Sequence, residues 1–160
     1  MSRPFYRFEN FQARNSVGYL NKRLHNLLGQ ATDTLFADQE LTFAQWVTLV
    51  SLRDNIADTC AGIARHLGHD SGATTRMIDQ LEARGFLTRS RCKTDRRVVK
   101  LALTTQGRAV AKALAPHLIN FWNDVLKDFS HAEATQLIGL LTRLLAGMER
   151  EVAARQVDQA

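Results

Sequence analysis

The residues of this chain that are best suited to chemistry are basic and lie close together. Between residues 84 and 100 the sequence has seven bases and a single acid, Asp95, which gives a local net charge of +6. The whole chain has a formal charge of +5, so the remaining residues carry a net −1. Clustered positive charge favours a polyanionic partner, because it steers association with negative charge. The bases are Arg84, Arg89, Arg91, Lys93, Arg96, Arg97 and Lys100.

This basic cluster falls on a predicted hairpin. The segments FLTRSR (86–91) and VVKLALT (98–104) are typical of strands, and CKTDRR joins them as a loop. The second segment alternates apolar and polar positions, which predicts that Val99, Leu101 and Leu103 anchor it in the core.

Two short helices are predicted before the hairpin, on either side of a tight connection at 68–70. Thr59 is placed to cap CAGIARHLG, which ends at Gly68, and Ser71 to cap GATTRMIDQLEARG, which ends at Gly85. A further helix starts with a capping box, Thr42 with Gln45. Helix, turn, helix and basic hairpin is the order of a winged helix-turn-helix.

The second helix of this pair has a polar face that suits a DNA major groove. The inner positions of the pair are Ile63 and Leu67 in the first helix and Thr74, Ile78 and Leu81 in the second. Arg76 can reach guanine O6 and N7 with two hydrogen bonds, while Thr75 and Ser71 can meet a phosphate, a base edge or a thymine methyl. Gln80 lies beside them.

Long amphipathic helices flank this central part. Apolar stripes run through 12–37 and 105–129, and Ser130 with Glu133 forms a capping box before a third long helix. Pro116 is expected to kink or divide the second of these helices. A small central domain cannot cover three such stripes, so we predict a homodimer, with an intrachain bundle as the alternative. The predicted dimer contacts are Phe8, Phe11, Leu137, Leu141 and Leu144.

The predicted fold is therefore mainly α with a small β-hairpin: a winged helix-turn-helix with flanking dimerisation helices. Residues 1–40 and 105–160 form the predicted dimerisation region, and residues 41–104 the DNA-binding domain.

Residues 71–107, SGATTRMIDQLEARGFLTRSRCKTDRRVVKLALTTQG, resemble the MarR family of transcriptional regulators. The resemblance implies a dimer with recognition helices in successive major grooves, and Arg97 of the wing reaching into the flanking minor groove. Asp95 would hold the geometry of that arginine, with Lys93 and Arg96 as phosphate contacts. A narrow minor groove rewards an inserted arginine. The chain departs from the family at Gly62, where a glutamate is common; that helix is either looser at its start or packed more closely.

The resemblance also implies a small aromatic or phenolic effector that releases a repressor from a palindromic operator. The residues predicted to line its pocket are Tyr19, Arg23, Phe43, Trp46, His117 and Phe121. An arginine beside aromatic rings suits an aromatic carboxylate. The alternative is that Trp46 and Phe121 are core residues and Arg23 an ordinary surface base.

Other functions are weighed against these. Cys92 lies among bases that would lower the pKa of its thiol, which makes a redox-responsive regulator the main alternative. His66, His69 and Cys60 are too few for a zinc site, and we expect no metal and no cofactor. The sequence contains neither a nucleophile elbow nor a phosphate loop, so nothing in it indicates an enzyme. A winged helix used for protein contact is the third alternative.

The sequence has two cysteines, no secretory signal and no long apolar run, which predicts a cytoplasmic protein.

Overall fold

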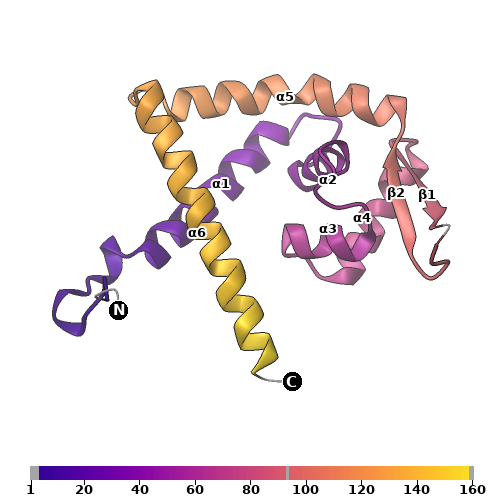
Figure 1. Ribbon diagram of the computed structural model, residues 1–160. Coiled ribbons are helices and arrows are strands. Elements are labelled where there is room, and N and C mark those ends of the chain that lie inside the picture. Colours follow the sequence, from indigo (N-terminus) through magenta and orange to yellow (C-terminus); the bar gives the residue numbers. More distant parts are fainter. Residues whose placement is uncertain (1–3, 93, 159–160) are drawn as a thin grey trace. The chain divides into compact units, whose positions relative to one another are not determined.

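The computed structural model describes residues 4–92 and 94–158, and Lys93, a predicted phosphate contact, lies outside them. The described residues form six α-helices and one antiparallel hairpin (Figure 1), which confirms the predicted fold class. The helices are α1 (Val17–Phe36), α2 (Phe43–Arg53), α3 (Cys60–Leu67), α4 (Ser71–Ala83), α5 (Thr105–Val125) and α6 (His131–Val157). The strands are β1 (Leu87–Arg91) and β2 (Val99–Leu103), and two short 3-10 helices, Phe8–Asn10 and Ala13–Asn15, precede α1.

The chain divides into two compact units, residues 1–116 and 117–160. The first unit joins α1 and the start of α5 to the predicted winged helix. The ring of Phe36 in α1 lies 6.1 Å from that of Trp46 in α2, and the Trp46 indole N–H donates to the Ala111 carbonyl of α5 at 3.0 Å. That residues 1–40 and 105–160 act together in dimerisation stays a prediction.

The core of the first unit is built from apolar residues of every element in the helix-turn-helix. Leu49, Ile63, Ile78 and Leu81 are fully buried between the helices. Phe86 and Leu87 continue this core into the base of the hairpin at 1% exposure each. In α2 the greatest burial falls on Leu49, Thr48 and Ser51, whereas Phe43, Val47 and Val50 are only half-buried.

Local hydrogen bonds explain where the short helices begin. The capping box of α2 is present, with Thr42 Oγ1 accepting from the Gln45 amide and Gln45 Oε1 accepting from the Thr42 amide. Thr59 caps α3 as predicted. This helix ends at Gly68, whose φ of +67° is a left-handed conformation that glycine adopts without strain.

The predicted cap of α4 was wrong by one residue. Asp70, not Ser71, is the N-cap: its Oδ1 accepts from the Ala73 amide at 2.8 Å. Ser71 is already the first helical residue. Both residue types are good caps, and the two-residue turn after Gly68 decides between them because it leaves Asp70 in the extended conformation that a cap requires.

The hairpin pairs Leu87 with Leu103 at its base and Arg91 with Val99 at its far end. On this face the side chains of β2 become exposed toward the far end of the hairpin: Leu103 and Leu101 are buried, but Val99 is 41% exposed. The prediction that Val99 anchors the strand was therefore wrong, because the hairpin extends beyond the core that covers its base. The Leu101 amide donates to the Asp58 carbonyl at 2.8 Å, which fixes β2 to the α2–α3 connection.

Gly107 marks a close approach between α5 and the connection from α4 to β1. Thr104 caps α5 through a 3.0 Å bond from the Gly107 amide, and its own hydroxyl donates to the Gly85 carbonyl at 2.7 Å. A Cβ added at Gly107 would lie 1.9 Å from the Phe86 carbonyl oxygen. Gly62 in α3 is a milder case, with Thr59 Oγ1 3.0 Å from such a Cβ, which favours close packing over a looser helix start.

The long helices differ from their predicted bounds at the ends. The stripe predicted from residue 12 begins as a 3-10 turn, and α1 starts at Val17. Helix α5 continues through Pro116 instead of being divided there, and it ends at Val125, before Phe129. Helix α6 has the predicted capping box of Ser130 and Glu133.

Candidate nucleic-acid interface

The outward face of α4 is exposed and polar, as the sequence predicted. Ile78, Leu81 and Thr74 face the core, and the Thr74 hydroxyl donates to the Asp70 carbonyl at 2.9 Å. Apart from Ala83 at the last position of the helix, the residues that remain exposed are Ser71, Gly72, Thr75, Arg76, Asp79 and Gln80. This face combines hydroxyls, an amide and a guanidinium, which are the groups that read base edges.

The amino-terminal end of α4 is ordered by charge as well as by hydrogen bonds. The hydrogen bond from the Ala73 amide holds the pKa of Asp70 below its usual range. The hydrogen bond from the Gly72 amide and the charge of Arg76 contribute to a smaller extent. The Arg76 guanidinium reaches back toward this end, since its Nη1 would lie 3.7 Å from a Cβ at Gly72. Arg76 therefore lies over the first turn of the helix that would enter a groove.

Two of the predicted contact residues already have partners within the protein. Gln80 Oε1 accepts from Gln45 Nε2 at 3.2 Å, so α2 holds its amide. The Thr75 hydroxyl donates to the Ser71 carbonyl at 2.8 Å and lies 3.4 Å from Cys60 Sγ. Thr75 thus presents its methyl group and an oxygen lone pair more readily than its proton.

The loop at the far end of the hairpin is closed by bonds around Asp95. The Cys92 amide donates to the Val98 carbonyl at 2.8 Å, and the Val98 amide to the Asp95 carbonyl at 3.0 Å. Asp95 Oδ1 accepts from the backbone amide of Arg97 at 3.0 Å. Among the described residues no ion pair joins the Asp95 carboxylate to the Arg97 guanidinium. Asp95 orders the backbone beneath Arg97 and leaves the guanidinium exposed.

Ion pairs divide the basic cluster into two groups. Three of its bases pair with acids that lie outside the cluster: Arg84 with Glu40 at 3.1 Å, Arg89 with Asp79 and Glu82 at 2.6 Å each, and Lys100 with Asp58 at 2.5 Å. Within the described part of the chain, Arg91, Arg96 and Arg97 are exposed and form no ion pair. The charge available to a polyanion is therefore concentrated at the outer half of the hairpin.

Cys92, at the start of the loop, has an acidic thiol. The pKa of Cys92 is lowered to about 7, first by a hydrogen bond with the Thr94 hydroxyl at 3.2 Å and then by the Asp95 and Thr94 amides. Lys100 adds a smaller electrostatic contribution. The sequence predicted the direction of this shift but attributed it to the neighbouring bases. Donors within the loop are the main cause, because they bond directly to the sulfur.

Residues 41–99 match the family model described as the MarR family. These are the residues of α2, α3, α4 and most of the hairpin. The chain carries a MarR-family domain.

Solved structures share the fold of this MarR domain and of the helices around it. BpsR from Bordetella bronchiseptica, whose DNA binding is regulated by 6-hydroxynicotinic acid, is 27% identical with a TM-score of 0.70, over 84% of this chain and 96% of that chain. Wild-type MarR from E. coli is 26% identical with a TM-score of 0.69, over 81% and 97%. CouR, a transcriptional repressor bound to a 23-mer DNA duplex, is 27% identical with a TM-score of 0.69, over 81% and 92%. The fold is that of MarR-family transcriptional regulators.

A cavity of about 200 Å³ lies where α1 meets the MarR domain. Apolar side chains of α1 and α2, including Leu28, Phe43 and Val47, line it together with His25 and with His69 from the turn before α4. Of the predicted ligand residues only Phe43 lines this cavity. His25 was missed because it does not stand out from the helical pattern of the sequence, and His69 was weighed only as a metal ligand.

The other predicted ligand residues are not among those that line this cavity. Trp46 is buried at 9% exposure, with its ring stacked on Phe43 at 6.1 Å, so it belongs to the core. Tyr19 and Arg23 are exposed on α1. His117 and Phe121 belong to the second unit, where the Phe121 ring packs edge-on against Trp122 at 5.4 Å.

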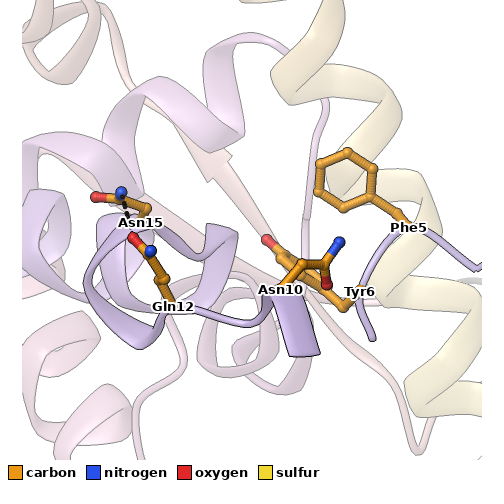
Figure 2. Close-up of a pocket in the computed structure, with 5 residues that line it drawn as sticks. All are labelled: Phe5, Tyr6, Asn10, Gln12 and Asn15. Atoms are coloured by element: carbon orange, nitrogen blue, oxygen red, sulfur yellow. Dashed lines mark hydrogen bonds between the residues drawn. The ribbon is translucent and has the colours of Figure 1, made fainter. Parts of the chain in front are cut away.

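A second hollow, of about 240 Å³, lies in the amino-terminal segment before the MarR domain. Figure 2 shows its lining residues, with Asn15 Nδ2 donating to Gln12 Oε1 at 3.2 Å. Phe5, Tyr6 and Asn10 complete the lining. The Tyr6 hydroxyl accepts from the Val17 amide at 2.9 Å, so this segment provides a hydrogen-bond partner for a backbone amide in the first turn of α1.

The predicted dimer residues are exposed in the single chain. Phe8 and Phe11 are 96% and 52% exposed, and Leu137, Leu141 and Leu144 of α6 are between 36% and 44% exposed. Their exposure agrees with the idea that a second copy covers them, since a monomeric protein rarely leaves so many large apolar side chains in water.

The described residues, 4–92 and 94–158, contain no cluster of three or more His, Cys, Asp or Glu side chains able to hold a metal ion. Within the same residues, no helix has the length and apolar character needed to cross a membrane.

Proposed function

We propose that this chain is a dimeric, sequence-specific DNA-binding transcriptional regulator that acts as a repressor. The observation that carries the proposal is the pairing of two surfaces: an exposed polar face on α4 and three exposed arginines at the outer half of the hairpin. The first suits a major groove and the second a phosphate backbone or a narrow minor groove.

In this proposal the contacts are divided by task. Arg76 reads a guanine, Ser71, Thr75 and Gln80 contribute to the same groove, and Arg96 contacts phosphate together with Lys93. Arg97 enters the minor groove from a loop that Asp95 orders. CouR, with a similar fold, is a repressor bound to a DNA duplex, which supports DNA as the partner here.

Dimerisation follows from the exposed apolar residues of α6 and the amino-terminal segment. A two-fold dimer presents two copies of α4, so the operator is an inverted repeat with half-sites about one helical turn apart. Sedimentation equilibrium tests this: a dimer is expected, and a monomer at micromolar concentration would contradict it. Leu141→Asp on α6 should shift the population toward monomer by burying a charge in the interface.

The effector in this proposal is a small aromatic acid. The cavity at His25 and His69 has the volume for one ring and is lined mainly by apolar side chains, with the two imidazoles as polar groups. His69 directly precedes Asp70, the cap of α4, so a ligand that displaces His69 would disturb the start of the recognition helix. Tyr19, Arg23, His117 and Phe121 remain predicted contacts. BpsR, which responds to 6-hydroxynicotinic acid, supports this ligand class.

A mobility-shift assay with the DNA upstream of the protein's own gene tests the function. A discrete, competitor-resistant complex is expected, which benzoate-type acids release. Binding with no preference over random DNA would contradict the proposal of a sequence-specific regulator. Specific binding that no aromatic acid releases would contradict the effector alone.

A second candidate function is redox control through Cys92, favoured by its pKa of about 7. A thiolate at the loop that orders Arg97 would alter DNA binding once it is oxidised. Peroxide should then release the complex from the wild type but not from Cys92→Ser. Equal release of both proteins would contradict the redox role.

A further inference from the structure

Arg89 occupies an unusual position for a base of the cluster. It lies in β1 opposite Leu101 and on the same face of the hairpin as the buried Leu87. Its side chain is only 28% exposed, whereas Arg91, at the next position on this face, is exposed. The fold therefore turns Arg89 toward α4 and away from solvent.

Three bonds join Arg89 to α4. One guanidinium nitrogen, Nη2, lies 2.6 Å from Asp79 Oδ1, and the other, Nη1, donates to Glu82 Oε2 at 2.6 Å. The backbone amide of Arg89 donates to the second Glu82 oxygen, Oε1, at 3.2 Å. Asp79 and Glu82 are three residues apart, so they lie on one face of the helix. A planar guanidinium held by two carboxylates has a defined direction, unlike a lysine ammonium.

This arrangement connects the two DNA-facing elements. Asp79 and Glu82 lie in the second half of α4, and Arg89 lies midway along the strand that leads to the loop of Arg97. Other bonds to the strands come from outside α4: the Asp58 carboxylate pairs with Lys100, the Asp58 carbonyl accepts from the Leu101 amide, and Arg108 Nη2 of α5 donates to the Leu103 carbonyl. Arg89 is thus the side chain of the hairpin that bonds directly to the recognition helix in the described residues.

Direct contact with DNA accounts less well for Arg89. Both terminal nitrogens of its guanidinium already hold carboxylates, and Asp79, at 56% side-chain exposure, lies on the face that would approach phosphates. An acid there repels DNA unless a base neutralises it. Arg89 supplies that neutralising charge in addition to the mechanical link.

We infer that Arg89 is a positioning residue: by bonding Asp79 and Glu82 it fixes the angle of the wing to the recognition helix, so that Arg97 and α4 reach adjacent grooves together. This inference rests on the proposed DNA-binding function. It predicts that breaking the link weakens specific binding even when the change makes the protein more positive.

Glu82→Gln is the most discriminating variant because it removes an acid while keeping the size of the side chain. If Arg89 acts only through its charge, the loss of a nearby acid frees it for phosphate and strengthens binding to every sequence. If Arg89 positions the wing, specific affinity falls by about tenfold, on the scale of lost charge-assisted hydrogen bonds, while non-specific affinity rises. Stronger specific binding by Glu82→Gln overturns the inference.

Hydroxyl-radical footprinting of Arg89→Gln shows which contact is lost. The expected footprint keeps the protection of the major-groove half-sites and loses the flanking minor-groove protection due to Arg97. Arg84→Gln, which removes a base of the same cluster and an ion pair with Glu40 that does not reach the hairpin, is the matched control, and it should keep the whole footprint. An Arg89→Gln footprint identical to that of Arg84→Gln overturns the inference.

Hydrogen exchange of the free protein separates this inference from the proposed function. Amides of residues 87–103 should exchange faster in Glu82→Gln and Arg89→Gln than in the wild type, while those of α2 stay unchanged. Unchanged hairpin exchange overturns the link. If the wild type binds no DNA, the proposed function fails, and faster hairpin exchange then still establishes the link itself.

Discussion

The carboxylate of Asp95 accepts a hydrogen bond from the backbone amide of Arg97, two residues later, at 3.0 Å. The bond is an Asx-type turn, which gives the loop a local partner for a backbone amide. The resemblance to MarR proteins implied that Asp95 holds the geometry of Arg97; in this chain Asp95 contacts the backbone of Arg97, and the guanidinium is left exposed. The single acid of the basic cluster therefore has a structural role that adds little competition for the arginine.

This contact predicts different results for two substitutions of Asp95. Asp95→Asn keeps an oxygen that can accept from the Arg97 amide, so DNA affinity should stay within about threefold of the wild type. Asp95→Ala loses the acceptor and should weaken binding by about threefold to tenfold, the usual range for one hydrogen bond. Fluorescence anisotropy with the operator measures both. A weaker Asn variant and an unaffected Ala variant would contradict the backbone role.

Arg97 and Arg76 should differ in how they affect specificity. Arg97→Ala is expected to weaken binding and reduce the slope of log K against log salt by about one contact. Arg76→Ala should also relax the preference at one base pair in each half-site, at a cost of about 1–3 kcal/mol for the preferred base. Salt titrations on a set of single-base operator variants separate the two effects. If both variants bind all sequences as the wild type does, the interface is wrongly assigned.

Gly107 should tolerate no side chain, because the Phe86 carbonyl oxygen would lie 1.9 Å from its Cβ. Gly107→Ala is expected to lower the free energy of unfolding by about 1–3 kcal/mol, as overpacked sites do, and to lower Tm by several degrees. Gly139 in α6 is the matched control, since a Cβ there meets nothing within 4 Å. Gly139→Ala should raise stability by about 0.5–1 kcal/mol through helix propensity. Equal Tm values for the two variants would contradict this packing.

The reactivity of Cys92 should report its lowered pKa. Because the thiolate is the nucleophile, alkylation of Cys92 by iodoacetamide should rise with pH through a midpoint at about 7. The Thr94 hydroxyl is the largest cause of the lowered pKa, so Thr94→Ala should move the midpoint upward. Mass spectrometry of the modified peptides measures the alkylation of Cys92 separately from that of Cys60. A midpoint that Thr94→Ala leaves unchanged would show that the hydroxyl does not stabilise the thiolate.

Patterns within one element were predicted well from the sequence. The capping residues Thr42, Thr59 and Ser130, the turn at Gly68 and the exposed polar face of α4 each depend on neighbours within a few positions along the chain. Periodicity and capping encode such features directly. The cap of α4 is the exception, because Asp70 and Ser71 are chemically equivalent candidates and the geometry of the preceding turn selects between them.

Relationships between distant residues could not be predicted in this way. The basic cluster looks uniform in the sequence, yet three of its bases are paired with acids that lie before residue 84 in the chain. These acids are Glu40, Asp58, Asp79 and Glu82. The cavity residues His25 and His69 likewise meet only through the packing of α1 against the MarR domain. Val99 fits its strand pattern but lies past the end of the core. Periodicity marks the face of a residue and does not indicate how far the core extends.

The central claim is that α4 and the outer half of the hairpin bind specific DNA. Its most direct test is the ratio of affinities for the upstream operator and for a scrambled duplex of equal length, measured by fluorescence anisotropy from 50 to 200 mM salt. We predict a ratio of at least about 10³ at physiological salt, with affinity that falls as salt rises. A ratio near one across this range would contradict the account.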